Sequence, residues 1–145
     1  MKIETKYHGV LEVSEQDVVT FPNGIPGFNE EKQFTVIPFS EDGEFQILQS
    51  VSTPELGFVV TNPFAFFSDY DFKLEEQTVE ALELNAPEDV EVFTVLTVQE
   101  TFTRTTANLQ APVVINRKKK LGKQVILTGS SYLTKHKLFQ EAESK

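Results

Sequence analysis

Few side chains in this sequence could take part in catalysis. The chain has two histidines, His8 and His136, and no cysteine, which excludes thiol nucleophiles, disulfides and thiolate metal sites. His8 fits a hairpin turn and His136 lies in a polar C-terminal segment, so neither is favoured as a general base. The glycine-rich motifs of phosphate and dinucleotide sites are absent, as is the nucleophile elbow of serine hydrolases. The sequence therefore indicates a protein that is not an enzyme.

The strongest candidate for chemistry is the pair of carboxylates in Asp69-Tyr70-Asp71. In an extended segment both would project from one face, where they could share a cation. Apart from Glu75 or Glu76, no third ligand lies at a fixed spacing nearby, so metal binding is not favoured. A solvated acidic edge, or a docking site for basic side chains, is the favoured interpretation. No metal or other cofactor is expected.

The same region is rich in aromatic residues, with five rings between residues 62 and 72. These rings could line the core, where phenylalanine usually lies. They could also form a protein-binding surface in which apolar anchors are rimmed by charge. The second interpretation predicts a partner-binding set that consists of Phe66, Phe67, Asp69, Tyr70, Asp71, Glu75 and Glu76.

The charge of the chain is unevenly distributed. The 145 residues carry a formal net charge of −9, but residues 1–100 hold 20 acids against four lysines. Such a field repels nucleic acid and attracts basic partners, although it would also serve solubility alone. The basic residues 117–120 could contact RNA as part of a nucleic-acid-binding β-barrel. A hairpin turn is the better interpretation, because the segment lies between two β-type runs and no aromatic residue is interleaved with it.

The elements that must position these residues are short β-type runs separated by turns. We expect a hairpin over residues 3–13, a helix over 73–84, and a short helical turn over 29–32. Near-continuous Val, Phe, Thr and Leu at 90–98 predict a strand covered on both faces. Further strands are expected at residues 18–21, 34–37, 45–51, 57–61, 113–115 and 124–128.

The fold class that follows is mostly β, with one or two short helices. We expect a single domain over residues 1–145, an antiparallel β-barrel-like fold or a sandwich, with a polar tail from about residue 134. The longest uncharged stretch, between Glu55 and Asp69, is interrupted by Asn62 and Pro63 and is too short to span a bilayer. Without a visible targeting signal, a cytoplasmic protein is expected.

Five blocks of sequence are distinctive as an ordered set. They cover residues 1–9, 20–28, 48–51, 60–63 and, above all, 106–116, which reads Thr-Ala-Asn-Leu-Gln-Ala-Pro-Val-Val-Ile-Asn. Together they resemble the FliW family of bacterial flagellar assembly factors over nearly the whole chain, to about Tyr132. The resemblance implies a small β-barrel-like fold without catalysis, which agrees with the independent interpretation of the residues.

The resemblance also implies a function. FliW-like proteins bind flagellin in the cytoplasm and, once flagellin is exported, bind the translational repressor CsrA, which relieves repression of flagellin messenger RNA. The effect on CsrA is expected to be allosteric, and the free protein to be monomeric. The family-motif residues Asn62, Pro63, Asn108, Leu109 and Pro112 have two open interpretations, as structural residues or as partner contacts, and the first is favoured.

Overall fold

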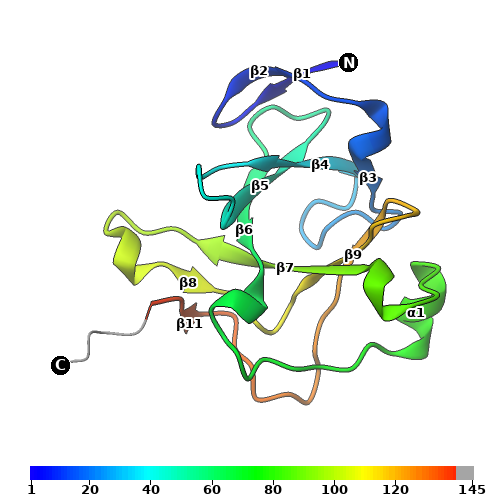
Figure 1. Cartoon of the computed structure of the whole chain (residues 1–145), viewed down its shortest axis with the longest axis vertical. Coiled ribbons are helices and arrows are strands. Elements are labelled where there is room, and N and C mark those ends of the chain that lie inside the picture. Colours follow the sequence, from blue (N-terminus) through cyan, green and yellow to red (C-terminus); the bar gives the residue numbers. More distant parts are fainter. Residues whose placement is uncertain (140–145) are drawn as a thin grey trace.

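The computed structural model describes residues 1–139, and its regular secondary structure is mostly β-strand, joined by long loops (Figure 1). Over these 139 residues, one short α-helix and four 3-10 turns connect the strands. The strands are β1 (Lys2–Thr5), β2 (Gly9–Glu12), β3 (Val18–Thr20), β4 (Gln33–Pro38), β5 (Phe45–Ser50), β6 (Gly57–Thr61), β7 (Val90–Thr97), β8 (Thr106–Ala107), β9 (Val113–Asn116), β10 (Leu121–Gln124) and β11 (His136–Lys137). The helix is α1 (Glu76–Ala81), and the 3-10 turns are η1 (Glu15–Asp17), η2 (Pro63–Ala65), η3 (Pro87–Asp89) and η4 (Phe102–Arg104).

Seven of these strands close into a barrel. The order runs β7-β6-β5-β4-β3-β10-β9, and β9 pairs back onto β7. Every pairing in the ring is antiparallel except β3 with β10, a parallel seam of one residue pair, Thr20 with Leu121. The N–H of Thr20 donates to the carbonyl of Lys120 at 2.9 Å and strengthens this seam. The prediction of a mostly β, barrel-like fold is confirmed.

Alternate residues of the same strands form two apolar clusters on opposite faces of the sheet, as the period of a strand requires. One cluster takes buried residues from β3, β4, β5, β6, β7 and β9, so it fills the barrel. It includes Phe21, whose ring lies over Gly122 of β10; a Cβ atom there would be 2.6 Å from Phe21 Cζ. This position of β10 therefore needs a glycine, because any larger residue would collide with the ring of Phe21.

The second cluster lies on the outer face of the barrel. It includes Ile37, Ile47, Val59 and Val114, each adjacent in sequence to a residue of the inner cluster or of its partly buried surroundings. The β1–β2 hairpin, the segment from η2 to α1, and the C-terminal segment that ends in β11 surround the barrel (Figure 1). Side chains from all three pack against the outer cluster. The aromatic residues between positions 62 and 72, which we call the ring-rich segment, therefore have a structural role as well as an exposed side.

Several expected boundaries differ from the observed ones. The helix expected over residues 73–84 is only Glu76–Ala81, because Phe72 and Leu74 are partly buried on alternate positions, which fits an extended segment. Its end is fixed by Glu83 at φ 54°, with the N–H of Leu84 bonded to the carbonyl of Val79. Residues 29–32 are turns and loop, not helix, next to the isolated bridge between Ile25 and Phe28.

The C-terminal third contains two more corrections. The hairpin around residues 117–120 forms as expected, but its second strand is Leu121–Gln124 and not 124–128. Within the segment expected to be a polar tail, His136 lies in β11 and pairs with β8, and Leu138 is buried. The rest of that predicted tail, residues 140–145, lies outside the described residues. By contrast, β7 is confirmed as a strand covered on both faces, since its consecutive residues Phe93 and Thr94 are both buried.

Candidate partner-binding surface

The ring-rich segment starts with a capped turn. The side-chain oxygen of Asn62 accepts the N–H of Phe64 at 2.9 Å, and Pro63 occupies the first position of η2, where its missing N–H costs nothing. Pro63 is buried while Phe64 beside it is exposed. Asn62 and Pro63 therefore shape the chain at the point where it leaves β6, which fits their structural interpretation.

Tyr70 is a core residue, and the expectation that it offers an exposed ring is wrong. Its side chain is 4% exposed, and its hydroxyl donates to the carbonyl of Leu109 at 2.7 Å. The ring also lies against Tyr132, with 4.7 Å between the centroids. Burial raises the pKa of Tyr70, so the hydroxyl stays protonated and keeps donating this bond. Composition alone could not distinguish the buried ring of Tyr70 from the more exposed rings of the same segment, because all of these residues are aromatic.

Phe66 and Phe67 are half-buried and contribute to an aromatic surface. Four rings, those of Phe45, Phe66, Phe102 and Phe139, form a closed cycle with centroids 5.4–6.0 Å apart, which we call the aromatic cluster. Phe67 lies beside it against the ring of His136. Phe102, from η4, is 39% exposed and gives the cluster its outer side. The sequence could not indicate this set, because its members come from four distant segments.

The four predicted acids lie along one exposed stretch. Asp69, Asp71, Glu75 and Glu76 are all exposed, and the ion pairs of the described residues involve none of them. Within residues 1–139, no three histidine or carboxylate side chains gather closely enough to hold a metal ion. The acids are thus available to basic groups of a partner.

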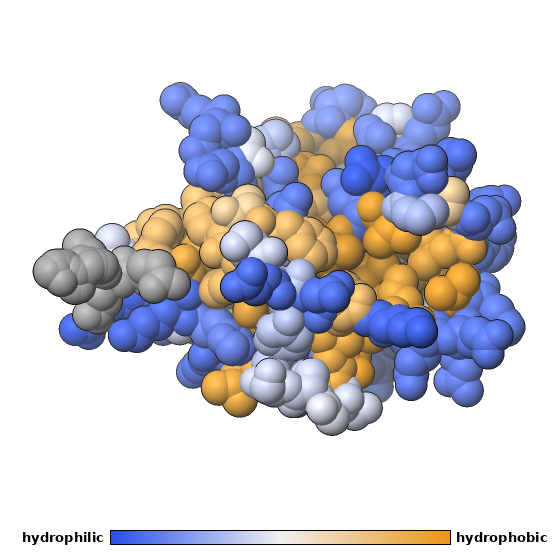
Figure 2. Space-filling model, turned by 60° about the horizontal axis from the view of Figure 1, so that its bottom comes forward, coloured by the Kyte–Doolittle hydropathy of each residue, from blue (hydrophilic) through white to orange (hydrophobic). Residues whose placement is uncertain are grey.

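Residues 71–73 separate two hollows in the surface. The larger, about 830 Å³, has apolar walls from Phe64, Phe72 and Val90 and a charged rim that includes Asp42 and Arg117. The smaller, about 330 Å³, lies on the side of residues 125–130 and Tyr132. Figure 2 shows hydrophobic residues gathered between hydrophilic ones on this side of the molecule. The rings of Phe64, Phe72 and Tyr132 and the acids Asp71 and Glu75 therefore border these hollows, an arrangement expected of a protein-binding surface.

The family-motif residues near β9 hold the chain together. The side-chain oxygen of Asn108 accepts the N–H groups of Gln110 and Ala111, and Leu109 is buried. The carbonyl of Pro112 accepts the N–H of Val125. These contacts support the structural interpretation of Asn108, Leu109 and Pro112.

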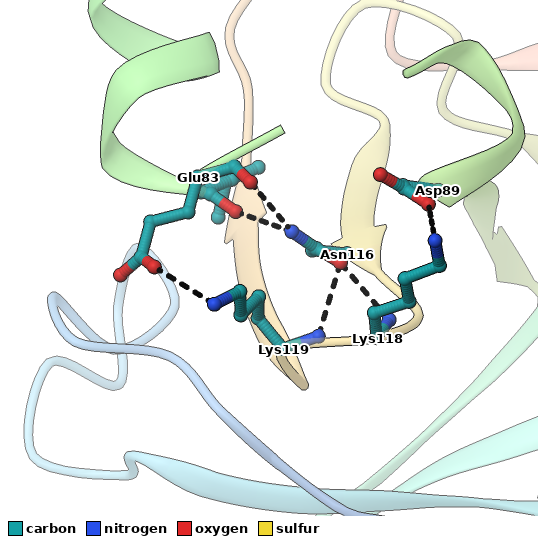
Figure 3. Close-up of polar contacts among 6 residues, drawn as sticks. Glu83, Asp89, Asn116, Lys118 and Lys119 are labelled. Atoms are coloured by element: carbon teal, nitrogen blue, oxygen red, sulfur yellow. Dashed lines mark hydrogen bonds and ion pairs between the residues drawn. The ribbon is translucent and has the colours of Figure 1, made fainter. Parts of the chain in front are cut away.

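Next to this region, the basic turn is anchored by Asn116 (Figure 3). This buried side chain donates to the carbonyls of Leu82 and Glu83 and accepts the N–H groups of Lys118 and Lys119. Lys118 Nζ lies 3.3 Å from Asp89 Oδ1, and Lys119 Nζ lies 3.7 Å from Glu83 Oε1. Two of the four basic side chains thus face acids of the same molecule, which weakens the interpretation of residues 117–120 as an RNA contact.

Comparison with known proteins gives consistent results. The family model described as "FliW protein" matches residues 2–138. A flagellar assembly factor FliW from Geobacillus kaustophilus is 55% identical over 145 residues, covering 100% of both chains. The factor of the same name from Bacillus subtilis is 50% identical over 142 residues, covering 98% of this chain and 99% of the relative.

A solved structure agrees with the fold. A crystal structure described as the flagellar assembly factor FliW superposes with a TM-score of 0.93 at 53% identity. The similarity covers 97% of this chain and 99% of that one. In the described part of this chain, no helix is long and apolar enough to cross a membrane.

Proposed function

Because this chain belongs to the FliW family of flagellar assembly factors, we propose that it binds flagellin in the cytoplasm and antagonises the translational repressor CsrA. In this role it acts by protein–protein contact, without catalysis and without direct contact to nucleic acid. Release from flagellin on export would free it to bind CsrA and so relieve repression of flagellin messenger RNA.

The observation that carries this proposal is the family match, which extends over almost the whole chain at 50–55% identity to the relatives. Two surface properties support it. The exposed rings suit an apolar segment that must be kept from assembling, and the unpaired acids suit a basic RNA-binding protein.

Co-purification of the chain with flagellin and CsrA, separately and together, tests the proposal. We expect a stable complex with each partner alone, measured by size-exclusion chromatography with light scattering. The three-component mixture shows whether the partners share one surface. If neither partner forms a complex at micromolar concentrations, the proposed function is wrong.

We propose that flagellin binds chiefly through apolar contacts with Phe66, Phe67 and Phe102. Truncation of an anchor ring at a desolvated contact typically costs ~2 kcal/mol, or roughly thirtyfold in affinity. Phe67→Ala and Phe102→Ala are therefore each expected to weaken flagellin binding by about that factor, measured by calorimetry on variants whose thermal unfolding is unchanged.

Phe28 provides a matched control for this prediction. Its ring is 42% exposed, close to the 39% of Phe102, but it packs on Phe58 and not in the aromatic cluster. Phe28→Ala should bind flagellin normally. Equal affinities for the three variants and the parent chain would show that flagellin binds elsewhere.

For CsrA we expect the acids to act on the association rate. Reversing Asp71, Glu75 and Glu76 to lysine removes an attractive field for a basic partner, so association at low salt should slow several-fold. Because screening shortens the Debye length from ~8 Å at physiological ionic strength to ~3 Å at 1 M, the defect should fade in molar salt. Stopped-flow mixing at two salt concentrations measures this, and flagellin binding should suffer less.

The control reverses three exposed acids elsewhere, Glu4, Glu15 and Glu30, which changes the net charge by the same amount. If position matters, this control slows CsrA much less than the first triple variant. If both triple variants slow CsrA association equally, the effect comes from net charge and not from the position of the acids. An unchanged low-salt rate in the first variant would falsify steering by these acids.

A further inference from the structure

Residues 71–75 form an extended segment that belongs to no sheet, which we call the edge segment. Its side chains alternate: Phe72 and Leu74 are partly buried and pack on the outer cluster, while Asp71, Lys73 and Glu75 are exposed. This is the pattern of a half-buried strand, but within residues 1–139 the backbone groups of Phe72, Lys73 and Leu74 have no hydrogen-bond partner. A strand with unpaired backbone is a template for pairing with another chain.

The direction of these unpaired groups follows from Tyr132. Its hydroxyl accepts the N–H of Asp71 at 3.0 Å and donates to the carbonyl of the same residue at 3.1 Å. In an extended chain both backbone groups of one residue point to one side, and the side alternates from residue to residue. The N–H and C=O of Lys73 therefore point to the same side as those of Asp71, toward Tyr132 and the smaller hollow.

The opposite side of this hollow also presents an unpaired backbone group. The N–H groups of Val125 and Leu127 donate to the carbonyls of Pro112 and Gln110, so the backbone of Ile126 between them points away from that pairing. The N–H of Ile126 has no partner among the described residues, and its side chain is exposed. A hollow of about 330 Å³, lined by residues 71–73 and 125–128, thus has unpaired groups on two sides.

We propose that an extended segment of the basic partner, CsrA in the function proposed above, adds as a strand to the edge segment in this hollow. Backbone hydrogen bonds to Lys73 would supply affinity, as in other cases of strand addition. Charge selects this partner, because the exposed acids Asp71 and Glu75 line the hollow with Lys73. Two further exposed acids, Asp69 and Glu76, lie close by in the sequence. The inference rests on the proposed function and assigns one surface of it.

A proline at position 73 tests the backbone contact directly. Lys73→Pro removes one N–H that is unused in the free chain, and its neighbour Phe72 already lies in the extended segment that a following proline requires. Lys73→Ala is the matched control, since it loses the same charge and keeps the N–H. We expect Lys73→Pro to weaken CsrA binding about tenfold relative to Lys73→Ala, with unchanged thermal unfolding of both variants.

Amide hydrogen exchange of the unmodified chain provides a second measurement, which does not depend on a variant. The amides of Lys73 and Ile126 should exchange rapidly in the free protein and slow at least tenfold with CsrA bound. Equal affinity of the two variants, or unchanged exchange in a complex that does form, would overturn the inference and leave the proposed function standing. If flagellin and not CsrA slows the exchange of these amides, the site binds flagellin. If exchange slows as the concentration of the free chain rises, the site binds a second copy of this chain. If no complex forms at all, the proposed function has failed first.

Discussion

Replacing Tyr70 by alanine should lower the free energy of unfolding by about 3–5 kcal/mol, the usual cost of truncating a large buried aromatic side chain. The residue has the burial that such a loss requires, and its ring packs against Phe72 and Tyr132 as well as Phe64. Urea unfolding followed by tyrosine fluorescence or circular dichroism measures the loss. A variant as stable as the parent chain would place Tyr70 outside the core.

Tyr70→Phe separates the ring from its hydroxyl. The variant keeps the packing but leaves the carbonyl of Leu109 without the donor 2.7 Å away, so a smaller loss of about 1–2 kcal/mol is expected. If Tyr70→Phe cost as much as Tyr70→Ala, the hydrogen bond would dominate the ring. Flagellin binding by the folded Tyr70→Phe variant should be normal, which distinguishes this core residue from Phe67 and Phe102.

Replacing Asn116 by alanine should be nearly as damaging, at about 3 kcal/mol. This one side chain satisfies four backbone groups, two carbonyls at the end of α1 and two N–H groups in the basic turn. Each buried polar group left without a partner typically costs ~1–3 kcal/mol, and part of the loss is recovered where water can reach the turn. The change in the urea midpoint, compared at constant slope, gives the value.

Lys119→Ala is the control for Asn116. It removes the ion pair with Glu83, in which both side chains are more than half exposed, and keeps the N–H that bonds to Asn116. Exposed pairs of this kind contribute ~0–1 kcal/mol. Comparable losses in the two variants would mean that the ion pair, and not the amide of Asn116, anchors the turn.

Local pattern predicted most of the strands because their causes are local. The alternation in residues 3–13 and the turn residues after β3 and before β6 act over a few positions, and the structure places strands there. The helix was overestimated because a loose apolar stripe over residues 73–84 also fits an extended segment followed by a short helix. Phe72 and Leu74 are held by the outer cluster, a tertiary contact that overrides helical propensity.

The candidate site was predictable only in part. Asp69, Asp71, Glu75 and Glu76 are exposed as charged residues usually are, and their clustering is visible in the sequence. The exposure of each ring was not predictable, because Tyr70 and Phe67 are three residues apart in the same aromatic run. Phe102 joins Phe66 only through the fold, and the role of Asn116 arises from contacts with residues 82 and 83, far away in the sequence.

The single parallel seam between β3 and β10 also determines when the barrel can close during synthesis. Strands β3 to β7 leave the ribosome first and can pair in order, but β9 and β10, which join the two ends of that sheet, come later in the chain. Until they emerge, the nascent sheet has two open edges, which are templates for wrong pairing. Ring closure pairs Thr20 with Leu121, which are far apart in the sequence. The entropic cost of closing this long loop therefore arises late in folding. The last third of the sequence thus turns an aggregation-prone sheet into a closed barrel.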